Sequence, residues 1–212
     1  MDEHEAVRRA LCEAARWLYE RGHNAPRDGN LSIRVDERLV LCTPSARHKG
    51  RLVPNDVVRV RWPTGDPLDE GRRPSGELAM HLAIYAARPD VRAVVHAHSP
   101  LSVGLSLAGV SMDPPLVPEA VVALGSIPTV PYAPPGSEAL ARAVAAALRD
   151  ADAAVLERHG PVTVGRDLDE AIERLEVVEH TARITLAAIA AGGATPMSAD
   201  EVARLRAAAG RR

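Results

Sequence analysis

Hydrophobic and polar positions in the first part of the chain follow two spacings, which predict a helix followed by a hairpin. Apolar residues recur at helical spacing over residues 5–21, and Gly22 supplies the stop. Residues 31–35 alternate with period two, and a second apolar run at 39–41 follows after a short polar turn. Residues 57–62 predict a third strand, so this region supplies one helix and three strands.

The middle of the chain predicts a helix, a buried strand and a second helix. Ser75 is the expected N-cap of a helix that ends at residue 87. The run 91–98 is rich in β-branched residues and lies between two prolines, which predicts a buried strand, and a helix is expected after Pro100. The proline-rich stretch 114–135 predicts loops around one short strand.

The last third of the chain predicts three helices and a pair of strands. Ser137 is expected to cap an alanine-rich helix that runs to residue 149. Residues 153–156 and 162–164 predict two paired strands. A long helix is expected over residues 168–190, and a polar linker leads from it to a last amphipathic helix at 198–209.

The intermixing of strands and helices predicts an α/β fold. The sequence has neither an internal repeat nor a long linker, so we expect one domain over residues 1–212, with its core at 5–190. The hairpins indicate a central sheet that is mixed and mostly antiparallel, with helices covering both faces. The first turns lack the glycine spacing of dinucleotide-binding and Walker-type loops, which disfavours those cofactor folds.

Composition narrows the class of function. The 26 Lys and Arg nearly balance the 28 Asp and Glu, and only 2% of residues are aromatic, so we expect no nucleic-acid partner. The start of the chain is acidic and no apolar run approaches ~20 residues, so we expect no targeting or membrane segment. Cys12 and Cys42 lie in apolar patterns that suit reduced core residues, which favours a cytoplasmic protein.

Lys49 is the only lysine in the chain. It lies in a polar Arg-His-Lys-Gly stretch, where we expect a solvated loop rather than a desolvating pocket, so Schiff-base catalysis is not expected. Its ammonium group could still add positive charge to a neighbouring anion site.

The segment Val94-Val95-His96-Ala97-His98 is the most informative motif in the chain. Residues two apart in a strand project from the same face, so His96 and His98 can reach one point above the sheet. Zinc favours imidazole nitrogen, and three protein ligands with one open position make a catalytic site. The alternative is a pair of hydrogen-bonded or surface histidines at a strand end.

A third ligand is needed, and His159 is the candidate. It ends an apolar strand and precedes Gly160-Pro161, a tight reversal where a ligand could approach. His81 lies four residues after Glu77 on one helical face and could support the site, although ordinary helix packing is the simpler interpretation. Glu77 is expected in the first helical turn, where the helix dipole alone favours a carboxylate, yet near a divalent metal it could act as a general base.

Three polar turns complete the set of candidate site residues. Asp28-Gly29-Asn30-Leu31-Ser32, Thr43-Pro44-Ser45-Ala46 and Ser75-Gly76 are rich in backbone donors and small polar side chains, and they could cradle a phosphate or a carboxylate. Each turn alone is common. Together with the histidines and Glu77 they predict a site that takes a metal and an anion.

In their order and spacing, these motifs resemble the class II aldolase and adducin family. The resemblance runs from the first helix to about residue 190 and is specific for the family rather than for any one of its activities. It is carried by six segments: Gly29-Asn30-Leu31-Ser32, Thr43-Pro44-Ser45, Pro74-Ser75-Gly76-Glu77, His96-Ala97-His98-Ser99-Pro100, Pro131-Tyr132-Ala133-Pro134-Pro135-Gly136 and Arg158-His159-Gly160.

The resemblance implies a metal-dependent aldolase. Within the family the chain is most similar to enzymes that cleave L-fuculose 1-phosphate, a ketose 1-phosphate, into dihydroxyacetone phosphate and L-lactaldehyde. His96, His98 and His159 would hold one Zn²⁺ per subunit, and Glu77 would exchange the proton at C3. Imidazole ligands also suit Co²⁺, Mn²⁺ or Fe²⁺. The phosphate of the substrate would be bound by side chains and backbone N–H groups of Gly29, Asn30, Ser45, Ala46, Ser75 and Gly76.

The resemblance further implies a small sugar phosphate as substrate and a homotetramer with active sites near subunit boundaries. Three departures separate this chain from the fuculose-phosphate aldolases. Ala46 stands where the phosphate loop usually has Gly, and Gly76 stands where a second Ser is usual. Residues 116–122 lack the tyrosine that serves as proton donor to the aldehyde oxygen.

These departures keep several alternatives open. One is a sibling metal-dependent enzyme: another deoxyketose-phosphate aldolase, a methylthioribulose-1-phosphate dehydratase, a decarboxylase or a 4-epimerase, although the epimerases have an aspartate where Glu77 stands. The other, from a different class, is a non-catalytic adducin-like interaction module.

Overall fold

One sheet of seven strands organises residues 4–210, the part of the chain that this computed structural model describes. The strand order is β3-β2-β1-β4-β7-β6-β5. Every neighbouring pair is antiparallel except β5 and β6, which are parallel. The strands are β1 (Asn30–Arg34), β2 (Leu39–Cys42), β3 (Val58–Arg61), β4 (Ala93–His96), β5 (Thr129–Val130), β6 (Ala153–Leu156) and β7 (Gly160–Gly165).

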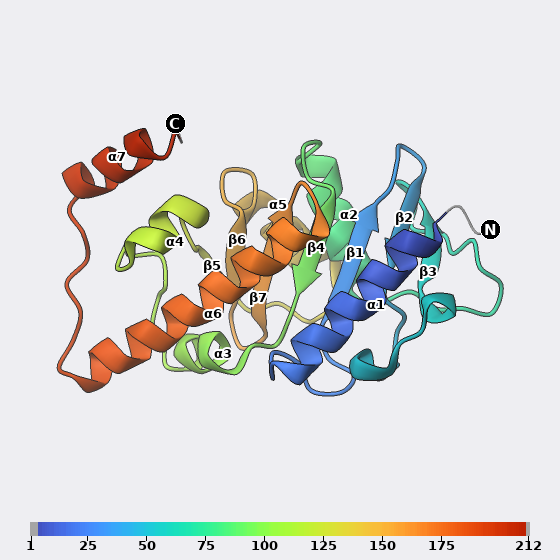
Figure 1. Cartoon of the computed structure of the whole chain (residues 1–212), viewed down its shortest axis with the longest axis horizontal. Coiled ribbons are helices and arrows are strands. Elements are labelled where there is room, and N and C mark those ends of the chain that lie inside the picture. Colours follow the sequence, from blue (N-terminus) through green and yellow to red (C-terminus); the bar gives the residue numbers. More distant parts are fainter. Residues whose placement is uncertain (1–3, 211–212) are drawn as a thin grey trace.

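Helices cover both faces of this sheet, and the α/β expectation is confirmed (Figure 1). The long helix α6 and the first helix α1 cross one face, and α2 and α5 pack together on the other. Two short 3₁₀ helices, Lys49–Arg51 and Pro54–Asp56, connect β2 to β3. The α-helices are α1 (Glu5–Glu20), α2 (Leu78–Ala87), α3 (Pro100–Leu107), α4 (Pro118–Ala123), α5 (Glu138–Ala147), α6 (Leu168–Ala190) and α7 (Ala199–Ala208).

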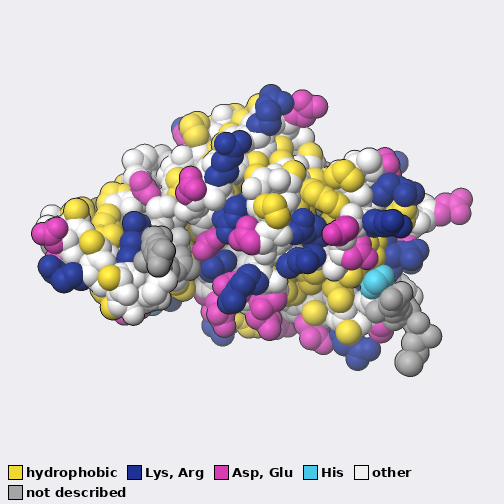
Figure 2. Space-filling view, turned by 90° about the horizontal axis from the view of Figure 1, so that it is seen from above, with side chains coloured by type: hydrophobic (Ala, Val, Ile, Leu, Met, Phe, Trp, Pro, Cys, Tyr) yellow, Lys and Arg dark blue, Asp and Glu magenta, His cyan; other side chains and the backbone are white. Residues whose placement is uncertain are grey.

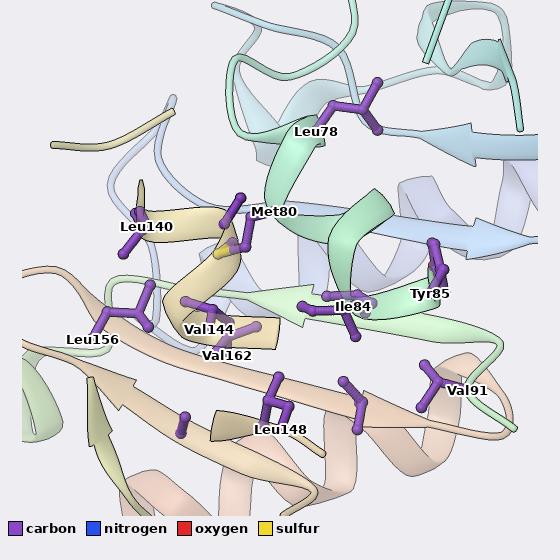
Figure 3. Close-up of a cluster of buried hydrophobic side chains, with 14 of the residues drawn as sticks. Leu78, Met80, Ile84, Tyr85, Val91, Leu140, Val144, Leu148, Leu156 and Val162 are labelled. Atoms are coloured by element: carbon purple, nitrogen blue, oxygen red, sulfur yellow. The ribbon is translucent and has the colours of Figure 1, made fainter. Parts of the chain in front are cut away.

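Buried apolar side chains form a separate layer on each face of the sheet. Between the sheet and α2 and α5, Ile84 and Met80 meet Val144 and Leu148, as Figure 3 shows. The opposite layer contains residues of α1 and α6 such as Leu175. Because each strand supplies side chains alternately to the two layers, the sheet is held from both sides.

The pairing of β1, β4 and β7 brings distant residues to one end of the sheet. Asn30 lies opposite His96 across the β1–β4 pair, and His96 lies opposite Val162 across the β4–β7 pair. The polar turn before β1, the end of β4 and the turn before β7 therefore meet at a single edge. This is the edge at which the predicted metal and anion ligands gather.

Three predicted features differ from the structure. Helix α2 begins at Leu78 with Glu77 at the N-cap position, so Ser75 is not the cap; instead its hydroxyl accepts the Glu77 N–H at 3.2 Å. Strand β4 ends at His96, which leaves His98 in the loop that follows. Helix α4 forms within the stretch that the prolines predicted as loop, because Pro118 occupies its first turn, where a missing N–H costs no hydrogen bond.

The last helix, α7, lies away from the sheet beyond α4 (Figure 1). Its N-terminus is a capping box in which Ser198 and Glu201 exchange hydrogen bonds. None of the residues of α7 is buried, and its main contact with the rest of the described chain is with α4.

Each edge of the sheet has a feature that limits further strand pairing. Along β3, the Arg61 N–H donates to the Asp66 carbonyl at 2.8 Å, and the Leu68 N–H donates to the Arg59 carbonyl at 2.9 Å. At the other edge, β5 has two residues and lies between Pro128 and Pro131.

The surface agrees with the balanced composition. Basic and acidic side chains are interspersed over the face that Figure 2 shows. Across residues 4–210, no helix is both long enough and apolar enough to cross a membrane.

The inner face of α6 supports a direct test of the packing. Leu175 is fully buried, whereas Leu186 on the same helix is 46% exposed. Leu175→Ala should lower the free energy of unfolding by about 2–5 kcal/mol because it leaves a cavity, and Leu186→Ala should change it by less than about 0.5 kcal/mol. Urea unfolding of both variants measures the difference; equal losses would contradict the described packing of α6.

Candidate metal centre and its pocket

His96 is the most deeply buried member of the site. It ends β4 and is fully inaccessible, and its Nδ1 donates to the Pro161 carbonyl at 2.9 Å. That bond places the proton on Nδ1 and leaves the lone pair of Nε2 toward the pocket. A metal-binding histidine is commonly oriented by such a hydrogen bond from its second nitrogen.

His98 reaches the same point from the loop after β4. Its main-chain N–H donates to Oδ1 of Asn24 at 3.0 Å, and its Nδ1 lies 3.4 Å from Oδ2 of Asp28. Glu179 of α6 fixes the next turn, because its carboxylate accepts the N–H groups of Leu101 and Ser102 at the start of α3 at 2.8 and 3.0 Å. The loop that carries His98 is thus held at both ends.

His159 lies in the turn between β6 and β7. Arg158 has a left-handed φ of +63° and Gly160 has a φ of +138°. A Cβ at Gly160 would lie 2.2 Å from the Ala97 carbonyl oxygen, so only glycine allows this turn to pack against the loop that carries His98. The close packing brings the rings of His98 and His159 to a centroid separation of 4.7 Å.

Glu77 faces the three histidines from the N-terminus of α2. Its Oε1 lies 3.4 Å from Nε2 of His159, and its Oε2 lies 3.6 Å from Nε2 of His96. Nδ2 of Asn30 donates to Oε2 at 2.8 Å. Oε2 is therefore held by Asn30 beside His96, while Oε1 faces His159.

The donor set fits a divalent metal ion. One ligand atom from each of Glu77, His96, His98 and His159 lies within 4.8 Å of all the others. Oε1 of Glu77 and Nε2 of His98 are buried and have no hydrogen-bond partner among the described residues. Burial, with His159 nearby, lowers the pKa of His96 and of His98, so both imidazoles keep the lone pairs that a metal requires. Three imidazoles and a carboxylate suit zinc and related first-row metals.

A pocket of about 860 Å³ opens beside these residues. Its wall contains Glu77, His98 and His159 together with all six residues of the predicted anion cradle: Gly29, Asn30, Ser45, Ala46, Ser75 and Gly76. The three turns from distant parts of the sequence therefore lie around one cavity next to the histidines. Binding of phosphate there remains a prediction.

The structure adds detail at three residues of the predicted anion cradle: Asn30, Ala46 and Gly76. Asn30 is 3% exposed and its amide already binds Glu77 and His81, so one Nδ2 hydrogen is left for a ligand. Ala46 adopts φ +56°, the left-handed conformation that favours glycine. A Cβ at Gly76 would meet nothing within 4 Å, so the absence of a side chain there widens the pocket.

The expectation for Lys49 is wrong. Its side chain is buried at 2% exposure, and burial lowers its pKa. Nζ donates to the carbonyls of Arg27 and Arg47 at 3.2 and 3.4 Å, and the residue lines the pocket. The polar neighbours in sequence gave no sign of this, because the 3₁₀ helix that starts at Lys49 packs against α1.

The contacts of His98 with Asn24 and Asp28 were not predicted, although Asp28 belongs to one of the polar turns. Asn24 and Asp28 lie in the loop between α1 and β1, which carries no regular periodicity. Nothing in their spacing from His98 points to contact, since about 70 residues separate them along the chain. Only the β1–β4 pairing brings them together.

Comparison with known proteins places this arrangement in context. A sequence profile described as "Class II Aldolase and Adducin N-terminal domain" matches residues 9–186. A protein of Escherichia coli strain K12 named 3-oxo-tetronate 4-phosphate decarboxylase is 33% identical, over 95% of this chain and 96% of its own length. Four further matches at 31% to 35% identity carry the same name.

An aldolase and a solved structure are also similar to the chain. L-fuculose phosphate aldolase of Methanocaldococcus jannaschii is 32% identical, over 84% of this chain and 95% of its own length. The crystal structure of YgbL from Escherichia coli, titled a putative aldolase/epimerase/decarboxylase, superposes with a TM-score of 0.88. It is 33% identical and covers 96% of this chain and 99% of that chain.

Metal binding by the cluster can be tested without any substrate. His96→Ala should weaken zinc binding by more than about 100-fold, beyond the loss expected for a residue that only orients a ligand. His180→Ala, which changes an exposed histidine of α6, should leave the affinity unchanged. Competition with a chromophoric chelator measures both; unchanged affinity in His96→Ala would contradict the assignment.

Proposed function

The chain belongs to the class II aldolase and adducin family, and from that premise we propose that it is a metal-dependent decarboxylase of a phosphorylated 3-oxo sugar acid, of the 3-oxo-tetronate 4-phosphate type. The observation that carries the proposal is the Glu77 carboxylate facing three histidines beside a pocket lined by three polar turns. With a metal bound, this arrangement would supply the three things that such a reaction needs: an electron sink, a proton donor and a phosphate site.

The chemistry of the substrate explains why an aldolase fold suits it. In 3-oxo-tetronate 4-phosphate, the C1 carboxylate is attached to C2, which lies next to the C3 ketone. When the C1–C2 bond breaks, its electron pair moves toward the ketone oxygen, CO₂ leaves, and C2 takes up a proton. The product is dihydroxyacetone phosphate, the same fragment that a fuculose-phosphate aldolase releases, so both reactions pass through the same enediolate.

The roles of the residues follow from this chemistry. His96, His98 and His159 would hold the cation, with Glu77 beside them. A bound divalent cation would supply a Lewis acid that stabilises the negative charge developing on the ketone oxygen. Glu77, whose Oε1 faces the cluster, would deliver a solvent-derived proton to C2.

The anion cradle would position the substrate phosphate. Ser45 and Ser75 offer hydroxyl groups, and Ala46 and Gly76 offer backbone N–H groups at the pocket wall. Lys49 adds a positive charge close by, because it lines the same pocket. Phosphate is held well by such a mixture of backbone donors and charge.

The placement of the tyrosines favours decarboxylation over aldol cleavage. A retro-aldol step must also remove a proton from the hydroxyl that becomes the aldehyde, whereas loss of CO₂ needs no such base. Tyr85 is buried beneath the site, Tyr19 packs against His48, and Tyr132 is an exposed loop residue. The five decarboxylases among the relatives support the same choice.

Aldol cleavage of a ketose 1-phosphate is the second candidate. The fuculose-phosphate aldolase of Methanocaldococcus jannaschii, at 32% identity, supports it, and the metal and phosphate sites would serve it unchanged. The two candidates differ in the fragment lost beside dihydroxyacetone phosphate, which is CO₂ in one reaction and an aldehyde in the other.

A direct comparison of substrates tests the proposal. Zinc-loaded protein should convert 3-oxo-tetronate 4-phosphate into CO₂ and dihydroxyacetone phosphate with a higher kcat/KM than for L-fuculose 1-phosphate, because a site selects by stabilising one transition state better. Coupled detection of each product measures both reactions. Faster release of L-lactaldehyde would favour the second candidate, and turnover of neither substrate would overturn the proposal.

The role of Glu77 has its own test. Glu77→Gln should retain zinc on the three histidines but slow proton exchange at carbon in dihydroxyacetone phosphate by about 10²- to 10⁴-fold, because an amide does not transfer the proton. NMR in heavy water follows the exchange. Glu173→Gln, at an exposed position of α6, is the matched control and should exchange at the parent rate. Full exchange in Glu77→Gln would refute the assignment.

A further inference from the structure

A line of buried polar groups runs beneath the pocket and ends on Glu77. The Tyr85 hydroxyl lies 2.7 Å from Oγ of Ser32, and Oγ of Ser32 lies 2.7 Å from Nδ1 of His81. Nε2 of His81 lies 2.5 Å from Oδ1 of Asn30, whose Nδ2 donates to Oε2 of Glu77 at 2.8 Å. Five side chains are therefore joined in one continuous series.

Two regular spacings build this series. Asn30 and Ser32 lie two apart on β1, so both project from the same face of the sheet. Glu77 at the N-cap of α2 is followed at intervals of four by His81 and Tyr85 within the helix, so the three form one stripe that faces β1. Two residues along a strand and four residues along a helix span a similar distance. The polar groups of β1 and of α2 can therefore meet one after another.

The contact between Asn30 and Glu77 sets the direction of the hydrogen bonds in the series. Oε2 of Glu77 accepts from Nδ2 of Asn30, so the carbonyl oxygen of the same amide faces His81. Nε2 of His81 must then carry the proton, and its Nδ1 must accept from the Ser32 hydroxyl. With its single proton used in this way, Oγ of Ser32 is an acceptor for the Tyr85 hydroxyl, which also lies 3.0 Å from the Ser32 carbonyl oxygen.

We propose that His81 is a positioning residue, which as the neutral Nε2–H tautomer fixes the amide of Asn30 so that its NH₂ faces Glu77. Oε2 is thereby held, and Oε1 remains directed at the histidine cluster. The proposal deepens the proposed function and rests on it only in that Glu77 moves the proton.

The surroundings of His81 agree with a neutral ring. The side chain is 2% exposed, and burial lowers its pKa to about 3, so the ring stays uncharged at neutral pH. If the proton were on Nδ1 instead, Asn30 would have to turn its NH₂ toward His81 and its carbonyl oxygen toward the Glu77 carboxylate. Two acceptors would then face each other in a buried site, which is unfavourable.

The tautomer can be observed directly and without activity. The full chain, labelled with ¹⁵N-histidine and loaded with zinc, should show His81 in the Nε2–H form at neutral pH in a long-range ¹H–¹⁵N spectrum. The signal is assigned by its loss in His81→Gln. An Nδ1–H ring or a charged ring would overturn the proposal whatever reaction the protein catalyses.

A pair of amide variants tests the consequence for proton transfer. The amide nitrogen of Gln can stand near the position of Nε2 and donate to Asn30, whereas Asn is too short to do so. In His81→Asn we expect exchange of dihydroxyacetone phosphate protons in heavy water to slow by about 10- to 100-fold with little change in KM, as for loss of a residue that orients a catalytic group. His81→Gln should recover most of that loss.

Ile84→Val is the matched control. Ile84 lies on the same helix but points into the apolar layer between α2 and α5, so its substitution loosens α2 without touching the polar series (Figure 3). It should lower the thermal midpoint and leave the exchange rate unchanged. Equal exchange in His81→Asn and the parent chain would overturn the proposal.

These experiments distinguish failure of the proposed function from failure of the positioning role of His81. If the parent chain exchanges no protons of dihydroxyacetone phosphate, the proposed function fails, and the tautomer experiment still decides the role of His81 in holding Asn30. If the parent exchanges and His81→Asn and His81→Gln lose activity equally, a donor to Asn30 is not what matters, and the positioning role is refuted.

Discussion

The antiparallel register of β1, β4 and β7 is the constraint on which the rest of the site depends. It sets Asn30 beside His96 and brings the turn before β7 against the loop after β4. A shift of one residue in either pair would turn these side chains to the opposite face of the sheet. The apolar layers on both faces oppose such a shift, so packing far from the pocket determines whether the ligand atoms meet.

The site concentrates polar groups where the protein excludes water. Oε1 of Glu77 and Nε2 of His98 are buried without a partner among the described residues, and an unmet group of this kind costs about 1–3 kcal/mol. Beneath them, in contrast, Asn30, Ser32 and His81 bind one another in series. Hydrogen bonds therefore order the residues around the histidine cluster, while polar atoms within it lack partners. This is the pattern expected of a pocket prepared for a ligand.

Patterns with a local physical cause could be predicted from the sequence, and contacts set by tertiary packing could not. The period of 168–190 predicted α6 at its observed bounds, and the motif containing His96 and His98 pointed to the cluster that the fold assembles. Burial of Lys49 was missed because the neighbours that enclose it are remote in sequence. The hydrogen bond between Asn30 and His81 was missed for the same reason, although the spacing of Glu77 and His81 already marked one face of a helix.

The way in which the sheet ends limits how molecules of this protein can associate. An open edge strand offers unpaired N–H and C=O groups that template another strand, and it is a common starting point for aggregation. Here the segment after β3 folds back to occupy that strand's outer groups, and prolines flank the two residues of β5. Part of the outer ladder of β3 is therefore already used by its own chain, and β5 offers only two residues, so association strand against strand is disfavoured at both edges.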